Sequence, residues 1–298
     1  MKRAMKKLSE QRYWDSVHQQ TGQAASSPAK QARDGEAVVE ATPGLKAKIK
    51  RFLGRDLLER MTNYDDYLLH EVILKTHLPE TVAPVRFLEV GSAPGLNLVY
   101  INKTYGYDTY GIDYSEVGVK LNQQIFAANN INPENVIHAD FFADSFQEQY
   151  RESFHMVCSY GFIEHFTDTE NVLDKHLNLL KPGGRLIVSV PNLRGFNRVL
   201  MTIFNKENLD IHYLDLMKKE RFRQAFTRPD LSPLLCDYYG TFNIYLCSPQ
   251  QGSWLRLPLA ALYKLQPLLN LTFRSAFGKR GAESGTFSPH LIFVGTKQ

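Results

Sequence analysis

Cysteine is scarce in this chain, with three residues in 298: Cys158, Cys236 and Cys247. An odd, scattered set without a Cys-x-x-Cys pair argues against a disulfide scaffold and against a cysteine-bound metal, so we expect reduced, mostly buried thiols. The chain also lacks a run of about 18 apolar residues, which argues against a transmembrane helix. Its basic start, residues 1–7, is not followed by an apolar segment of signal-peptide length. These absences predict a cytoplasmic protein.

The chain does contain enough apolar sequence for one large domain. Hydrophobic residues make up 43% of it, and the formal net charge is +4. Short, nearly continuous apolar runs alternate with segments of helical periodicity, and no internal repeat is visible. Such runs are typical of strands buried on both faces, so the pattern predicts an α/β fold with a mostly parallel sheet between helices.

The most informative segment is a loop of small residues that follows the first of these runs. The run ends in an acid, Glu89, and a helical pattern begins at Leu96. The loop between them contains Gly91, Ser92, Ala93, Pro94 and Gly95. A strand, a tight loop and a helix in this order bring backbone N–H groups close to a nucleotide-like ligand. Alone the signal is weak, because many turns contain two glycines.

Acidic residues also follow the next two strand candidates. Thr109–Asp113 ends in an acid 24 residues after Glu89, where it can accept hydrogen bonds from both hydroxyls of a ribose. The third candidate, Asn135–Ala139, is followed by Asp140, which can accept a bond from an adenine amino group. Phe141 beside it can cover the base. The acids therefore predict one nucleoside site at the carboxyl ends of the strands.

Two more strand candidates complete the pattern, residues 154–159 and 185–190, with a Lys-Pro-Gly-Gly turn at 181–184. In this order the motifs resemble the ubiquinone-biosynthesis-like branch of the class I S-adenosylmethionine (SAM)-dependent methyltransferases, over about residues 64–192. The resemblance implies a Rossmann-like, doubly wound, mostly parallel seven-stranded sheet with an antiparallel last strand and helical insertions. One departure is Ala93, where the family has a glycine; alanine is still small enough for a close backbone approach.

The resemblance implies S-adenosyl-L-methionine as the cofactor and assigns it a set of binding residues. The candidates are Glu89, Gly91, Ser92, Ala93, Gly95, Asp113, Tyr114, Asp140, Phe141, Ser159 and Tyr160.

Catalysis on a hydroxyl acceptor would need a base. His165 is the first candidate, because it follows the fourth strand on the cofactor side, and His212 is the second; a lone histidine is nevertheless more often structural. The pair Glu164-His165 also resembles the end of an acidic motif used for Mg²⁺ in some ubiquinone-pathway O-methyltransferases. Because Phe162 and Ile163 replace other parts of that motif, no metal is predicted.

The domain plan is an extension, residues 1–60, followed by a catalytic domain, residues 61–298. The extension is expected to contain a helix within residues 1–20, a linker over residues 20–43 and a basic helix around residues 46–55. A helix that opens at Tyr64 leads into the first strand, and in the resembled family it often closes one side of the cofactor pocket. An insertion over residues 193–227 is expected to form a lid over the acceptor, or else a plain surface hairpin.

The last two strands are expected at Thr241–Cys247 and Leu291–Thr296, with Cys236 in a helix before them. Between these strands lies a second insertion, residues 249–287. From Tyr238 to Ala282 there is no acidic residue. The same span is rich in leucine and aromatic residues, and its basic residues are Arg256, Lys264, Arg274, Lys279 and Arg280. This composition suits an anionic membrane surface or a lipid-linked acceptor, with core packing or a homodimer contact as the alternative.

The predicted function is SAM-dependent methylation of a small-molecule or lipid-linked acceptor, with oxygen as the favoured atom. Methylation at carbon or nitrogen, or a non-catalytic SAM-binding or RNA-binding role, are the alternatives. The Asn/Asp-Pro-Pro-aromatic motif of amino-methylating enzymes is replaced by residues 159–162, Ser-Tyr-Gly-Phe, and no Pro-Cys nucleophile is present. No binding module for a specific nucleic acid is recognisable. The predicted location is cytoplasmic, with peripheral membrane contact as an option.

Overall fold

A computed structural model describes residues 7–9, 11–25, 57, 60–79, 84–249 and 253–298. Helix α1, Gln11–Ala25, lies in the N-terminal extension. The helix predicted within residues 1–20 is therefore present, but it starts later and continues into the residues predicted as a linker. The rest of that linker and the basic helix predicted around residues 46–55 lie outside the described residues.

The centre of the molecule is one sheet of seven strands in the order β3-β2-β1-β4-β5-β7-β6. The strands are β1 Arg86–Val90, β2 Asp108–Asp113, β3 Val136–His138, β4 Phe154–Tyr160, β5 Leu180–Pro191, β6 Leu231–Tyr239 and β7 His290–Lys297. Strands β1 to β5 are parallel, and β7 runs antiparallel to both of its neighbours. The predicted fold class is confirmed. In such a sheet the strand order reverses between β1 and β4, and ligands bind beyond the carboxyl ends at that point.

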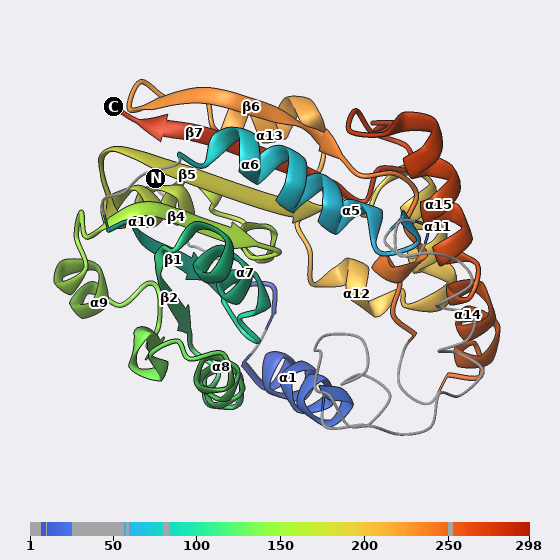
Figure 1. Cartoon of the computed structure of the whole chain (residues 1–298), viewed down its shortest axis with the longest axis horizontal. Coiled ribbons are helices and arrows are strands. Elements are labelled where there is room, and N and C mark those ends of the chain that lie inside the picture. Colours follow the sequence, from blue (N-terminus) through green and yellow to red (C-terminus); the bar gives the residue numbers. More distant parts are fainter. Residues whose placement is uncertain (1–6, 10, 26–56, 58–59, 80–83, 250–252) are drawn as a thin grey trace.

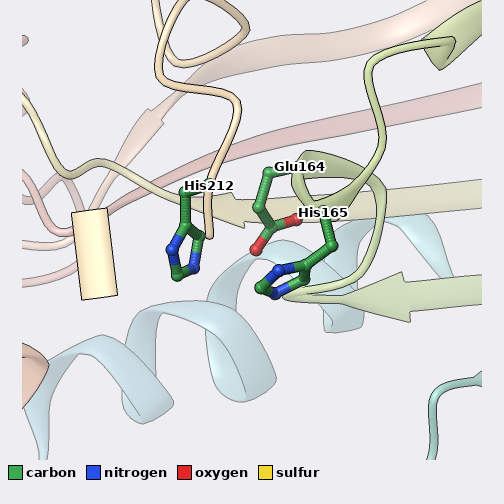
Figure 2. Close-up of side chains that lie close together, drawn as sticks. All are labelled: Glu164, His165 and His212. Carbon is green, nitrogen blue, oxygen red and sulfur yellow. The ribbon is translucent and has the colours of Figure 1, made fainter. Parts of the chain in front are cut away.

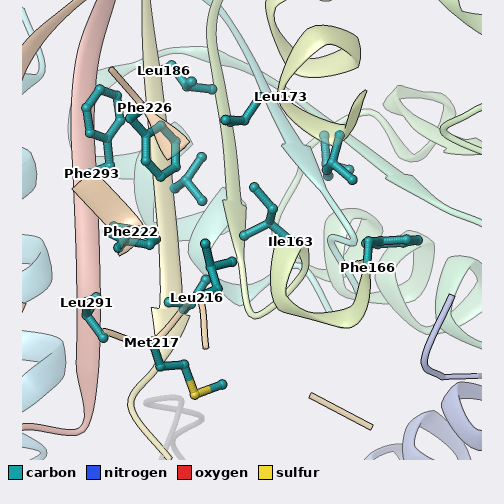
Figure 3. Close-up of a cluster of buried hydrophobic side chains, with 14 of the residues drawn as sticks. Ile163, Phe166, Leu173, Leu186, Leu216, Met217, Phe222, Phe226, Leu291 and Phe293 are labelled. Atoms are coloured by element: carbon teal, nitrogen blue, oxygen red, sulfur yellow. The ribbon is translucent and has the colours of Figure 1, made fainter. Parts of the chain in front are cut away.

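Helices cover both faces of the sheet, as the continuous apolar strands predicted (Figure 1). One face carries α5 Tyr64–Tyr67, the π-helical turn η1 Leu68–Leu74, α6 Lys75–His77, α7 Leu96–Tyr105 and α8 Glu116–Ala128. The other face carries α9 Asp144–Gln149, α10 Thr169–Leu179, α11 Gly195–Phe204 and α13 Lys219–Ala225. Neighbouring residues of β1 pack on opposite faces of the sheet. Phe87 lies in the hydrophobic core under the first group of helices, and Leu88 lies in the core under the second group. Figure 3 shows the second core, where Leu173 of α10 lies near Leu186 of β5.

Side-chain caps fix where two of these helices begin. Ser115 is the N-cap of α8, and its hydroxyl accepts a hydrogen bond from the Gly118 backbone. Asp168 is the N-cap of α10, which ends at Leu179, and Leu180 is the first residue of β5.

The prediction of a strand at Thr241–Cys247 is wrong. The strand that pairs with β7 on the edge of the sheet is β6, Leu231–Tyr239. It is the edge strand of the sheet and contains Pro233, which an edge tolerates and which obscures the strand pattern. Cys236 therefore lies in a strand. Thr241–Cys247 instead folds into a loop and the short turn η4, Ile244–Leu246, because the Asn243 side chain accepts a bond from the Tyr245 backbone.

Apart from α13, which packs beside β6, the helices of the two insertions lie at the end of the sheet where β5 finishes and β7 starts (Figure 1). The first insertion contains α11, the short α12, Glu207–Asp210, and α13. The second contains α14, Arg256–Tyr263, and α15, Gln266–Phe277. Among the described residues, none of the helices has both the length and the apolar character needed to cross a membrane.

Candidate functional site

The loop after β1 folds tightly because its two glycines have left-handed backbone conformations. Gly91 has φ +70° and Gly95 has φ +89°. A Cβ atom at Gly95 would lie 2.0 Å from Oδ1 of Asn122 on α8, so no side chain fits there. Ser92 accepts a hydrogen bond of 2.8 Å from the Asn122 amide, which holds the loop against α8. Ala93 is not among the residues with positive φ, so alanine fits the place of the family's glycine.

The strand-end acids lie where the sequence predicted, at the carboxyl ends of β1 and β2. Asp113 accepts hydrogen bonds from the backbones of Ser115, at 2.9 Å, and Ala93, at 3.4 Å, and burial raises its pKa. Glu89 is buried, and burial raises its pKa to about 8. One carboxylate oxygen of Glu89 has no hydrogen-bond partner among the described residues. Two buried acids and a glycine cradle fit a ligand that has several polar donors.

Ala93 and Asp113 border a cavity with about 760 Å³ of empty space, which we call the donor cavity after the ligand that the sequence predicts there. Seven of the predicted cofactor residues line it: Gly91, Ala93, Asp113, Tyr114, Asp140, Phe141 and Tyr160. The other four, Glu89, Ser92, Gly95 and Ser159, are not part of its lining. Of these, Ser92 and Ser159 are buried, and Ser92 holds the loop through its hydrogen bond with Asn122. The ring of Phe141 meets the ring of Phe162 edge-on, with 5.4 Å between centroids, so both aromatic side chains form one wall.

Part of the donor cavity comes from the N-terminal extension, which the sequence reasoning missed. Lys7, Trp14 and His18 line it, and Nε2 of His18 lies 4.0 Å from a carboxylate oxygen of Asp113. Asp15 accepts a hydrogen bond of 2.6 Å from the Ser115 hydroxyl, which fastens α1 to the start of α8. Helix α1 therefore closes the donor cavity. The one feature of the sequence that could have indicated this contact is Trp14 within an amphipathic segment, and such a pattern is not specific for a cavity wall.

A second cavity, with about 970 Å³ of empty space, adjoins the first, and we call it the acceptor cavity. Trp14, Tyr160, Gly161 and His165 line both. The other lining residues are Tyr13, Asp66, Leu69, Asn97, Glu164, Ser189, Val190, Pro191, Asn208, His212, Tyr239 and His290. The helical segment that opens at Tyr64 thus contributes to this cavity, through Asp66 and Leu69, and not to the donor cavity.

Both predicted catalytic histidines lie in the acceptor cavity, beside Glu164 (Figure 2). Their ring centroids are 4.5 Å apart. Glu164 and His165 belong to the turn η3, Ile163–His165, directly after β4, whereas His212 comes from the insertion after α12. Burial lowers the pKa of His165 to about 3 and that of His212 to about 4, and burial raises the pKa of Glu164 to about 8. At neutral pH the two rings are therefore uncharged.

The insertion over residues 193–227 covers the acceptor cavity only in part. Asn208 and His212 line the cavity. Helix α11 instead presents Phe196, Val199 and Ile203 to solvent, while Met201 and Phe204 pack into the core. Helix α12 and His212 shortly after it are thus the parts of the insertion that line the acceptor cavity.

Comparisons with known proteins agree with this geometry. A family model described as a methyltransferase domain matches residues 45–238. A curated relative, the ubiquinone biosynthesis O-methyltransferase of Sinorhizobium fredii (strain NBRC 101917 / NGR234), is 26% identical over 132 residues. That match covers 44% of this chain and 50% of the relative, so the chain aligns with half of the relative's length.

Among solved structures, the MccD protein is similar with a TM-score of 0.52 at 14% identity, covering 79% of this chain and 96% of that one. The geranyl diphosphate C-methyltransferase of Streptomyces coelicolor A3(2) is similar with a TM-score of 0.50 at 14% identity, covering 89% and 90%. At these identities the likeness shows the fold alone. The family model, in contrast, matches more than half of the chain. The chain therefore belongs to the methyltransferase domain family, as a class I methyltransferase whose methyl donor is SAM.

Proposed function

We propose that this enzyme transfers the methyl group to a hydroxyl oxygen of a small-molecule or lipid-linked acceptor held in the acceptor cavity. The observation that carries the proposal is the shared wall of the two cavities, formed by Trp14, Tyr160, Gly161 and His165. A donor in one cavity and an acceptor in the other would meet at this wall.

The donor cavity supplies a distinct partner for each part of the cofactor. Asp113 would accept hydrogen bonds from the ribose hydroxyls, and Asp140 would accept one from the adenine amino group, with Phe141 against the base. Bound SAM supplies a methyl group already activated on a sulfonium, so the protein has mainly to align the acceptor and exclude water. The buried rings around Phe141 and Phe162 favour this exclusion.

Proton removal from the acceptor is assigned to His165, with His212 as the second candidate. Nδ1 of His165 lies 2.9 Å from the Ile211 carbonyl oxygen, so that nitrogen carries the proton and donates. Nε2 of the neutral ring then keeps a lone pair that can accept a proton. Two neutral imidazoles and a carboxyl group in one cavity favour a hydroxyl acceptor; methylation at carbon or nitrogen is the alternative.

A lipid-linked acceptor is supported by the solvent-exposed residues of α14, α15 and the segments beside them, which we call the α14–α15 face. Its apolar side chains include Trp254, 79% exposed, and Leu257, 82% exposed. The other exposed members are Leu265, Leu268, Phe277, Arg256, Lys264, Lys279 and Arg280. On the opposite side, Gln266 donates to Asn270, and both side chains are buried against the body. Core packing therefore explains only part of this insertion, and the exposed part suits an anionic bilayer.

Methyl transfer can be tested with isotopically labelled SAM and separate aqueous and lipid extracts. We expect the wild-type chain to release S-adenosylhomocysteine with one extract, and mass spectrometry to locate the label on an oxygen. His165→Gln should form the same product at a much lower rate. Label on carbon or nitrogen would contradict O-methylation, and label only in the aqueous pool would contradict a lipid-linked acceptor.

Membrane contact can be tested by vesicle co-sedimentation with anionic and neutral lipids at low and moderate salt. Each Lys or Arg near an anionic surface contributes about 1 kcal/mol, so the four exposed basic residues should give weak, salt-sensitive binding. The double substitution Trp254→Ser and Leu257→Ser should reduce it, whereas Leu234→Ser, on the exposed edge strand β6, should not. Equal recovery of the wild type in every supernatant would exclude the membrane, and a dimer in solution would then account for the face.

A further inference from the structure

Glu164 is buried without a hydrogen-bond partner for either carboxylate oxygen among the described residues. Its side chain has no exposed surface, and both oxygens lack a partner. Buried polar atoms in folded proteins are nearly always paired, and an unpaired carboxyl group is costly. In Figure 2 the carboxyl group points into the space between the rings of His165 and His212. The unpaired oxygens therefore face two nitrogen bases.

Both histidine rings are held so that the same kind of nitrogen remains available. Nδ1 of His165 donates to the Ile211 carbonyl oxygen, and Nδ1 of His212 donates to the Asn208 carbonyl oxygen. In each neutral ring Nε2 then carries the lone pair. Metal-binding histidines have this arrangement, because a backbone carbonyl or carboxylate on one ring nitrogen fixes the tautomer and leaves the other nitrogen to coordinate.

The backbone fixes the three residues relative to one another, although they come from distant parts of the chain. The Tyr213 backbone donates a bond of 2.7 Å to the Glu164 carbonyl oxygen, directly beside His212. On the other side, the Leu8 backbone donates a bond of 2.8 Å to the His165 carbonyl oxygen. The segment of the insertion that contains His212 is thus bonded to the turn that contains Glu164 and His165.

We propose that Glu164, His165 and His212 form a binding site for one divalent transition-metal ion such as Zn²⁺. One ligand atom from each residue lies within 4.8 Å of the others. Ligands of one tetrahedral zinc ion, each at about 2.1 Å from it, lie about 3.4 Å apart, so modest side-chain rotations complete the site. The carboxyl oxygens of Glu164 have no hydrogen bond among the described residues that such a rotation would break.

The ligand types select the class of ion. Imidazole suits zinc, copper, iron and nickel, whereas magnesium and calcium prefer oxygen ligands throughout. The sequence predicted no metal because residues 162 and 163 break the acidic motif; the missing ligand comes from the insertion, as His212.

Three protein ligands leave a coordination position free, as in catalytic zinc sites. All three ligands line the acceptor cavity, so that position faces the acceptor. Coordination would occupy Nε2 of His165, so in the metal-bound chain the ion, and not this ring, would promote loss of the proton. A hydroxyl bound to the ion would lose its proton to water more readily, because the positive charge stabilises the oxygen anion. This consequence rests on the proposed O-methylation, whereas the metal site itself does not.

Metal binding can be tested directly on the untagged chain after any bound metal has been removed with a chelator. Titration with Co²⁺ should saturate at one ion per chain and give the visible absorption of an ion with nitrogen and oxygen ligands. Zn²⁺ should displace it, and Mg²⁺ at the same concentration should not. Glu164→Gln, His165→Gln and His212→Gln should each weaken Co²⁺ binding at least about tenfold. The control is His77→Gln, at the end of α6 and outside the acceptor cavity.

A variant that fails to fold would be recognised by its thermal unfolding curve, so stability gives a second measurement. Zn²⁺ should raise the melting temperature of the wild type and of His77→Gln, and should leave that of His212→Gln unchanged. The proposal is overturned if the wild type binds SAM but not Co²⁺, or if Co²⁺ binds equally to the three variants. Co²⁺ binding in a chain that transfers no methyl group would instead retain the metal site and contradict the proposed function.

Discussion

The donor cavity and the acceptor cavity share a wall but are built in different ways. Apart from the N-terminal extension, the donor cavity is lined from one continuous half of the sheet, between Val90 and Phe166. The acceptor cavity gathers residues from α1, α5, the turn after β4, the first insertion and the last two strands. The donor cavity is thus formed by segments that are close in the sequence, and the acceptor cavity by segments that only the fold brings together.

This difference matches the chemistry of the two ligands. A cofactor that is always the same can be held by short motifs, such as a glycine loop and one acid at the end of each strand. An acceptor cavity gains new shapes when insertions between strands change, while the sheet stays constant. The following substitutions test whether the two cavities can be disturbed separately.

The largest effect is expected from His165→Gln. Turnover should fall roughly 10²-fold or more, because proton removal from the acceptor is lost, while the affinity for SAM should change little. Steady-state kinetics and calorimetric titration with SAM check both statements, with His77→Gln as the control. A large loss of SAM affinity would instead give His165 a role in cofactor binding and contradict its role as the base.

Asp113→Ala should act on the donor cavity alone. It removes charge-assisted hydrogen bonds to the ribose, each worth roughly 1.5–3 kcal/mol, so the SAM dissociation constant should rise about tenfold or more. Asp108→Ala is the matched control, because Asp108 lies at the opposite, amino end of the same strand. Unchanged SAM affinity in a folded Asp113→Ala chain would mean that the nucleoside lies elsewhere.

The two glycines at the ends of α7 allow a paired stability measurement. Gly106 also has a positive φ, +68°, but a Cβ there would meet no atom within 4 Å. Gly106→Ala should therefore lower the free energy of unfolding by about 1 kcal/mol, from the backbone conformation alone. Gly95→Ala should lower the free energy of unfolding by at least about 1 kcal/mol more, because of the contact with Asn122. Chemical denaturation measures both; equal losses would mean that the loop after β1 is not tightly packed against α8.

The last substitution concerns pH and the acceptor side. Asp65 of α5 accepts hydrogen bonds from Thr241 and Asn243, and burial raises its pKa to about 7. Since the folded-state pKa lies above the unfolded value, the contribution of Asp65 is present at acidic pH and is lost as pH rises through about 7. Between about pH 4 and 7 this group alone should lower the free energy of unfolding by up to about 1.4 kcal/mol per pH unit.

Asp65→Asn should remove that slope when unfolding is compared across the same pH range. The substitution Glu134→Gln, at an exposed position before β3, should leave the slope as it is. A wild type and an Asp65→Asn chain with parallel pH profiles would show that Asp65 does not titrate in this range.

The sequence predicted the strands that carry local motifs, and it failed where contacts between distant segments decide. Asp113 could be placed because the end of a parallel strand fixes the position of the residue there. β6 was misplaced because an edge strand with Pro233 has no clear apolar pattern. The contribution of Trp14 and the meeting of His212 with His165 could not be predicted, because each depends on how an extension or an insertion packs on the sheet.

The most direct test of this account is a crystal structure of the chain with S-adenosylhomocysteine. The account predicts that the ribose hydroxyls lie within hydrogen-bond distance of Asp113, with the adenine beside Asp140 and Phe141. The sulfur atom should face the wall of Tyr160, Gly161 and His165, toward the acceptor cavity. A sulfur atom directed away from that wall, or a nucleoside bound away from Asp113, would contradict the central claim that methyl transfer occurs where the two cavities meet.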